Sequence, residues 1–215
     1  MIDLKTAEAK SLESAYRAQI VDIGRIFYDK NWSLATSSNY SVVLDKEPLR
    51  LLITASGKDK GKLTTSDFVT VSSSGKLIAG ENQDATLKPS AETMLHVMLG
   101  SKAGVGAVLH SHSVPATVLS QQHRQYGYIE IEGLEMLKAI SGITTHEARI
   151  RVPIFSNTQD IDSLARDVEE RYNELPKAFL VSGHGLYTWG ADLSEAKRHV
   201  EGLEFLFEVL LKSRG

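Results

Sequence analysis

Histidines are the residues of this chain best suited to metal chemistry, because it contains seven of them and no cysteine. His110 and His112 stand two apart at the end of the apolar segment VGAVLHSH. Side chains two apart in a strand project from the same face, so both imidazoles would point toward one place. His184 lies between two glycines, which allow a sharp turn and a close approach to a ligand. Three converging neutral imidazoles would form an open site for Zn²⁺ or a similar divalent ion.

Each of these histidines also has a plainer interpretation. One member of the 110/112 pair could point into the core, or both could be solvated. His184 could be a turn residue that is hydrogen-bonded to the backbone. For the remaining histidines we expect a surface position or a hydrogen-bonded place in the core; they are His96, His123, His146 and His199.

Two glutamates could supply acid–base chemistry. Glu92 stands at the start of a predicted helix, after Pro89, where a carboxylate also suits the helix dipole. Glu135 precedes an apolar helical stretch, where an ordinary first-turn carboxylate is equally expected. Only the surroundings that the fold gives them can distinguish these roles.

Three short polar segments could bind a phosphate if they converge. They are residues 36–39, 55–58 and 88–90, each rich in hydroxyls or exposed backbone N–H groups. None matches a P-loop, so a nucleoside triphosphate is not expected. Taken singly, each could be a turn.

The elements that must position these residues follow from hydrophobic periodicity. Strands and helices alternate, and several strand pairs read as hairpins, so a mixed or antiparallel sheet flanked by helices fits better than a doubly wound parallel sheet. Predicted helices span 6–30, 88–99, 113–123, 158–175 and 192–212, and a strand leads into a helix over 127–140. Other predicted strands lie in 36–44, 49–55, 105–112, 148–155 and 177–190, with a hairpin of 69–73 and 76–80.

Composition limits the possible functions. The 215 residues suit one domain over 1–215, and 42% hydrophobic with 24% charged residues is typical of a soluble globule. A formal net charge of −3 gives no sign of a nucleic-acid partner. The first residues do not read as a signal peptide, and no apolar run approaches the ~20 residues of a membrane span. We therefore expect a cytoplasmic protein.

The order of the motifs is more specific than any one of them. TSSNYS, ITASGKDKGKL, KPSAETMLH, VLHSHS and SGHGLYTWG, in that order, resemble the class II aldolase/adducin-head family over nearly the whole chain. Within it, KPSAETMLH, GLEMLKAI and GHGLYTWG look most like the sugar-phosphate dehydratases of methionine salvage.

The resemblance implies an α/β fold, an α/β/α sandwich around a mostly antiparallel sheet. It implies one Zn²⁺ per subunit, held by His110, His112 and His184, and a homo-oligomer, commonly a tetramer, with sites near subunit interfaces. It implies a phosphate pocket built from Ser37, Asn39, Ser56, Gly57, Lys88 and Ser90.

The implied activity is the zinc-dependent dehydration of 5-methylthioribulose 1-phosphate to 2,3-diketo-5-methylthiopentyl 1-phosphate. Glu135 matches a glutamate that looks catalytic in animal members of the dehydratase branch, and Glu92 matches the acid/base position of the aldolases. We rank Glu135 ahead for the dehydration step, with Glu92 as a fourth metal ligand or a support to the ligands.

The chain departs from the aldolase pattern at three positions. Ser38 and Ala91 stand where aldolases have glycine and serine, and Ala55 replaces a proline. These changes put the phosphate contacts in question but leave the metal site untouched. Apolar or aromatic residues such as Tyr126, Tyr187 and Trp189 could line a methylthio pocket, but core packing is the favoured role for each of them.

Other functions stay open at this point. A sugar-phosphate aldolase and a pentose-phosphate 4-epimerase would use the same metal chemistry. The fold also serves as a non-catalytic interaction module in adducin-like proteins, although the presence of all three candidate histidines speaks against that reading.

Overall fold

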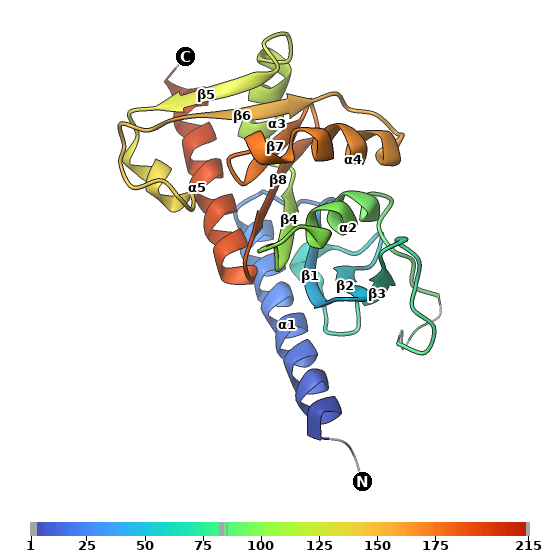
Figure 1. Cartoon of the computed structure of the whole chain (residues 1–215). Coiled ribbons are helices and arrows are strands. Elements are labelled where there is room, and N and C mark those ends of the chain that lie inside the picture. Colours follow the sequence, from blue (N-terminus) through green and yellow to red (C-terminus); the bar gives the residue numbers. More distant parts are fainter. Residues whose placement is uncertain (1–3, 82–83, 85, 214–215) are drawn as a thin grey trace.

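The strands of the computed structural model form one mixed sheet (Figure 1). The model describes residues 4–81, 84 and 86–213. In this part of the chain the sheet has eight strands, in the order β3-β2-β1-β4-β8-β7-β6-β5. Every neighbouring pair is antiparallel except β6–β7, as expected for a mostly antiparallel sheet. The strands are β1 (Asn39–Lys46), β2 (Leu49–Thr54), β3 (Phe68–Ser72), β4 (Ala107–Ser111), β5 (Tyr128–Glu132), β6 (Arg149–Phe155), β7 (Ala178–Val181) and β8 (Gly185–Gly190).

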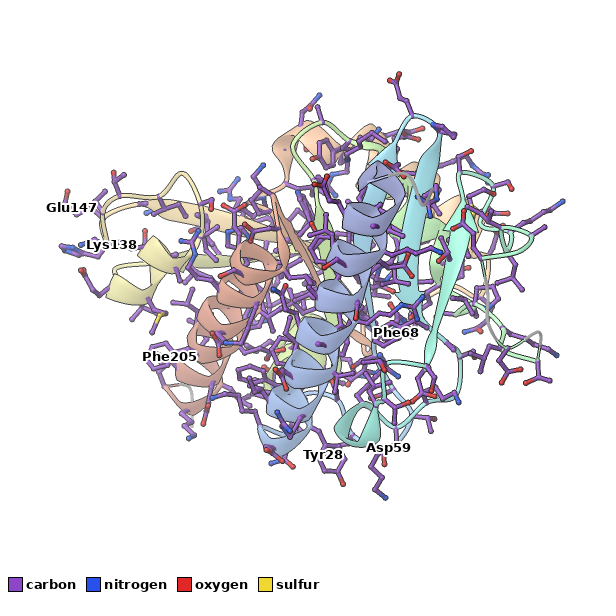
Figure 2. The ribbon with its side chains drawn as sticks, turned by 90° about the horizontal axis from the view of Figure 1, so that it is seen from below. Tyr28, Asp59, Phe68, Lys138, Glu147 and Phe205 are labelled. Atoms are coloured by element: carbon purple, nitrogen blue, oxygen red, sulfur yellow. The ribbon has the colours of Figure 1, made fainter. Side chains whose placement is uncertain are left out.

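Helices cover both faces of the sheet and complete the predicted α/β/α sandwich. One face packs against α1 (Leu4–Asp29), α3 (Val114–Gln122) and α5 (Leu193–Lys212). The other packs against α2 (Thr93–Ser101) and α4 (Ile161–Glu170). Figure 2 shows α1 and α5 side by side beneath the sheet. Among the described residues, no helix combines the length and the apolar character that crossing a membrane requires.

The helix starts follow local chemistry. The Asp160 carboxylate accepts a hydrogen bond from the Ser163 N–H, and the Asp192 carboxylate accepts one from the Glu195 N–H. Both aspartates thereby satisfy backbone donors that the first turn of a helix leaves unpaired.

Three predicted elements differ from the observed ones. Residues 76–80 form no regular strand, although the chain turns back toward β3 at Gly75, which has a positive φ. Leu77 forms an isolated bridge with Val71, and the Ile78 N–H donates to the Thr70 carbonyl oxygen. The helix predicted from 88 begins only at Thr93. The helix predicted after β5 is the short 3₁₀ helix η2 (Glu135–Ala139).

Candidate metal centre and adjoining pocket

A cross-strand row at the middle of the sheet supports the site. Asn39 of β1 pairs with His110 of β4, and His110 pairs with Tyr187 of β8. Directly paired residues project from the same face of a sheet. The His110 ring is fully buried and stacks on the Tyr187 ring, with the centroids 3.9 Å apart and the planes 13° from parallel. The central strands thus hold the imidazole in one orientation.

The three predicted metal histidines converge. The Nε2 atom of His110 lies 2.7 Å from Nε2 of His112 and 3.3 Å from Nε2 of His184. A ligand atom from each can be chosen so that all lie within 4.8 Å of one another. His112 directly follows β4, so the spacing of two at the end of this strand places both side chains on the same side, as the sequence indicated.

The glycines around His184 do what the sequence predicted of them. Gly183 has φ +65°, a conformation that side chains rarely adopt. A Cβ atom on Gly185 would lie 2.0 Å from the Ser111 carbonyl oxygen, so only glycine permits this approach of β8 to β4. The turn brings His184 against the end of β4.

The protonation states suit metal binding. The Leu186 carbonyl oxygen can only accept, so His110 Nδ1 donates to it over 2.9 Å and Nε2 keeps a free lone pair. Burial and then the neighbouring imidazoles hold the pKa of His110 well below its ordinary value. Burial, with the charges of His184 and Lys60, lowers the pKa of His112 to about 4. Both rings are therefore neutral at neutral pH, the form that ligates metals.

The donor set fits a tetrahedral ion. Zinc–nitrogen bonds of 2.0–2.1 Å at tetrahedral angles place ligand nitrogens about 3.3 Å apart. The His110–His184 separation of 3.3 Å already has this value, and His112 at 2.7 Å from His110 would move outward slightly. Three imidazoles that leave the remaining position open are the ligand set of a catalytic zinc site.

Glu92 lies beside this cluster. Its Oε1 is 3.2 Å from His184 Nε2, and its Oε2 is 3.6 Å from His110 Nε2. It occupies the N-cap position of α2, yet its side chain makes no capping hydrogen bond there. The carboxylate thus faces the imidazoles instead of the helix terminus.

A buried chain of hydrogen bonds holds Glu92. Asn39 Nδ2 donates to Glu92 Oε2 over 2.6 Å, which leaves Asn39 Oδ1 as the acceptor for His96 Nε2–H. His96 Nδ1 then accepts from the Ser41 hydroxyl at 2.7 Å. Burial lowers the pKa of His96 to about 3, so the ring stays neutral and keeps this pattern. His96 is the hydrogen-bonded core histidine that was expected, but its connection to Glu92 was not.

A cavity of about 280 Å³ opens next to the imidazoles. Five of the six predicted phosphate residues line it, namely Ser37, Asn39, Ser56, Gly57 and Ser90. Lys88 does not: its side chain is exposed, and its carbonyl oxygen accepts from the Ser56 N–H at 2.9 Å. The phosphate contact of Lys88 stays a prediction that the position of its side chain does not support.

Two contributions to the cavity were not predicted from the sequence. Lys60 lines it, although Lys60 lies in a segment read only as a polar loop. Residues 157–159, between β6 and α4, line it as well. No local signal separates Lys60 from Lys58 and Lys62, because burial of one lysine among three depends on packing against α1.

Glu135 lies elsewhere in the chain. It begins η2, its side chain is 70% exposed, and it pairs with Lys138 over 2.5 Å. It does not line the cavity. Its catalytic role stays a prediction, and within one chain Glu92 is the glutamate beside the imidazoles.

The remaining expectations concern packing. Tyr187 and Trp189 are buried in the core, whereas Tyr126 is exposed. His199 is buried, and its Nδ1 donates to the Trp189 carbonyl oxygen.

Ser38, which stands where aldolases have glycine, keeps a glycine-like backbone conformation with φ +70°.

This fold and this site define a class II aldolase-like protein. The family of Class II Aldolase and Adducin N-terminal domains matches residues 18–211, and the chain belongs to that family. The family inferred from the order of motifs is thus confirmed.

Named relatives specify the branch. The chain is 50% identical over 199 residues to the methylthioribulose-1-phosphate dehydratase of Pseudomonas fluorescens (strain Pf0-1), covering 91% of this chain and 92% of that protein. It is 42% identical over 205 residues to the protein of the same name from Sorangium cellulosum (strain So ce56), covering 94% of each. The resemblance to the dehydratase branch is therefore confirmed.

Solved structures agree on the fold. The crystal structure of l-fuculose-1-phosphate aldolase from Thermus thermophilus superposes with a TM-score of 0.74 at 24% identity, covering 94% of this chain and 96% of that chain. At that identity the likeness concerns architecture alone.

Proposed function

We propose that this protein is a hydro-lyase that dehydrates 5-methylthioribulose 1-phosphate to 2,3-diketo-5-methylthiopentyl 1-phosphate in methionine salvage. The observation that carries the proposal is the convergence of His110, His112 and His184 beside a cavity lined by segments that were predicted to bind phosphate. The 50% identity to a methylthioribulose-1-phosphate dehydratase supports this substrate over other sugar phosphates.

The three histidines are proposed to hold one Zn²⁺ per subunit. The neutral imidazoles of His110 and His112, and the 3.3 Å separation of the His110 and His184 Nε2 atoms, support this assignment. A divalent ion there would polarise the substrate carbonyl and stabilise the negative charge that develops when the neighbouring proton leaves. Glu92, 3.2 Å from His184, would be a further ligand or a fixed charge beside the ion.

Glu135 is proposed as the acid/base, brought to the site by a neighbouring subunit of a homo-oligomer, such as a tetramer. Two exposed apolar side chains near it, Met136 at 37% and Phe205 at 46% exposure, suit contact with another copy. Figure 2 shows Phe205 and Lys138 on the same side of the molecule. Glu135 would take the C3 proton, and the same or another acid would protonate the C4 hydroxyl as it leaves as water.

The cavity wall is proposed to bind the phosphate. Ser37, Ser56, Gly57 and Ser90 offer hydroxyl or backbone N–H donors around it. Holding the phosphate fixes which carbon faces the base, so binding energy remote from the reacting atoms orients the substrate. We place the enzyme in the cytoplasm, where methionine salvage supplies its substrate.

Turnover of methylthioribulose 1-phosphate, with and without chelator, tests the function. We expect loss of one water per substrate, abolished by chelation and restored by added zinc. Fuculose 1-phosphate and a pentose 5-phosphate are assayed in parallel. Release of dihydroxyacetone phosphate, or epimerisation at C4, without dehydration would replace the proposed reaction by an aldolase or an epimerase. Absence of bound metal with no turnover would favour a non-catalytic module.

A further inference from the structure

Lys60 is a buried lysine at the base of the cavity. It begins the 3₁₀ helix η1 (Lys60–Lys62) after β2, and its residue is only 1% exposed. The helix packs against α1 closely enough that a Cβ atom on Gly24 would lie 2.5 Å from the Lys60 carbonyl oxygen. By contrast, the side chain of Lys62 is 82% exposed.

The Lys60 ammonium has few partners. Its Nζ donates to the Lys58 carbonyl oxygen over 2.6 Å, which uses one of three N–H donors. Among the described residues, no carboxylate lies within ion-pair distance of it; the nearby Asp67 and Asp59 pair with Lys58 and Lys62. Burial lowers the pKa of Lys60 to about 8, against the opposing influence of Asp59 and Asp67. The amine is therefore mostly charged at neutral pH.

This charge lies where a phosphate is expected. Lys60 lines the cavity together with Ser56 and Gly57, the segment predicted to bind phosphate. Apart from histidines, it is the one cationic residue among the described residues of the lining, and Glu92 is the acidic one. A phosphate dianion needs more than neutral donors when it enters a partly desolvated cavity that already holds a carboxylate.

We propose that Lys60 binds the phosphate dianion of the substrate and thereby restricts the cavity to phosphorylated sugars. The assignment rests on the proposed function for the identity of the substrate, but the anion contact itself can be tested without turnover. A lysine ammonium binds phosphate as a point charge and does not need the bidentate geometry of arginine. One ammonium with two unused N–H donors is therefore enough for this contact. Lys88, the lysine that the sequence favoured, lies outside the cavity lining.

The test measures binding of inorganic phosphate to the zinc-loaded full-length protein by titration calorimetry. The variant K60M removes the charge and keeps the side-chain stem, and K62M is the control two residues away on the same helix. We expect K60M to weaken phosphate binding roughly ten- to hundredfold, the range for a hydrogen bond to a charged group, and K62M to match the wild type. Equal phosphate affinity in K60M and K62M would overturn the proposal.

Two further readouts separate this role from a structural one. Zinc content is measured for every variant, so that loss of metal is not mistaken for loss of the phosphate contact. If K60M fails to fold, a crystal structure of the wild type with inorganic phosphate decides: phosphate within hydrogen-bond distance of Lys60 Nζ supports the proposal, and phosphate bound only elsewhere ends it.

Catalysis gives the last readout. With methylthioribulose 1-phosphate, K60M is expected to raise KM more than it lowers kcat. If the protein does not dehydrate this compound but Lys60 still determines phosphate affinity, the proposed function fails and the Lys60 assignment stands.

Discussion

The Asn39 carboxamide joins Glu92 to His96. One end donates to the Glu92 carboxylate over 2.6 Å, and the other accepts from the buried imidazole. Because each atom of the amide has a partner of defined polarity, the amide cannot rotate without losing both bonds. Glu92 is thereby fixed beside the metal histidines by a residue that the sequence had assigned to the phosphate.

Changing Asn39 should therefore affect the metal centre. N39D would place a second carboxylate against Glu92, and N39A would remove the donor without adding charge. We expect turnover to fall about 10–100-fold in both variants, the usual cost of losing a group that orients metal ligands. In N39D the repulsion between the new carboxylate and Glu92 should also raise the pH at which the pair ionises. This change should shift the kcat–pH profile. An unshifted profile in N39D would contradict the proposed contact.

Removing one imidazole should remove the metal. H112A is expected to lose bound zinc and most turnover, because two nitrogen ligands do not hold the ion against solvent. H123A is the control, since that ring hydrogen-bonds the Leu119 carbonyl oxygen at the end of α3 and does not line the cavity. Metal analysis after dialysis checks the result. Full activity of a verified metal-free protein would refute the zinc proposal.

The two glutamates should behave differently. E135Q is expected to cut turnover by roughly 10²–10⁴-fold, the usual contribution of general acid–base catalysis, with zinc content unchanged. E92Q should instead weaken zinc binding, because its carboxylate lies 3.2 Å from His184. Steady-state kinetics and metal analysis are read together. If E92Q keeps zinc and is inactive while E135Q is active, the ranking of the two is reversed.

A subunit-mixing experiment tests where Glu135 acts. Refolding H112A and E135Q together should restore roughly a quarter of wild-type turnover, because a working site would take its histidines from one variant and Glu135 from the other. Each variant refolded alone is the control. No recovery in the mixture would show that Glu135 does not serve a neighbouring site.

Glu204 predicts an unusual pH dependence of stability. This α5 residue is fully buried, and burial raises the pKa of its carboxyl group to about 7, although Ser111 donates a hydrogen bond to it. The folded state therefore holds a proton that the unfolded state releases near pH 4.5, so stability falls as pH rises from about 4.5 to 7, by about 3 kcal/mol in all. E204Q should flatten this dependence in urea unfolding measured across that range. An equal slope in E204Q and the wild type would exclude the buried proton.

Ser38 occupies a glycine-like conformation. The φ of +70° costs the serine about 1 kcal/mol of backbone strain in the folded state. S38G would relieve this strain, but glycine also makes the unfolded chain more flexible, which lowers the stability of the folded state. We expect S38G to change the free energy of unfolding by less than about 1 kcal/mol, whereas the β-branched S38V should lower it by about 2 kcal/mol. Urea titration of both variants measures the difference; equal stabilities would contradict the strained angle.

Local patterns predicted those parts of the site that lie within one element. The spacing of His110 and His112 needs only a strand, and the turn at His184 needs only its flanking glycines. Both were therefore predictable from the sequence. The helix caps at Asp160 and Asp192 are local for the same reason.

Contacts between distant segments were not predictable in this way. The link from His96 through Asn39 to Glu92 joins β1 to residues more than 50 positions further along the chain, and it exists because α2 packs on β1. Lys60 is buried because η1 packs on α1, which no property of its own loop indicates. The proposed role of Glu135 involves another copy of the chain, and the pattern of one sequence does not show how copies assemble.

The central place of β4 and β8 in the sheet has a consequence for dynamics. An ion held by His110, His112 and His184 would link the end of β4 to the turn that precedes β8. Separating these two central strands at that end would then require release of the ion. The edge strands β3 and β5 carry no such constraint. Amide hydrogen exchange should therefore slow on metal loading in β4 and β8 far more than at either edge.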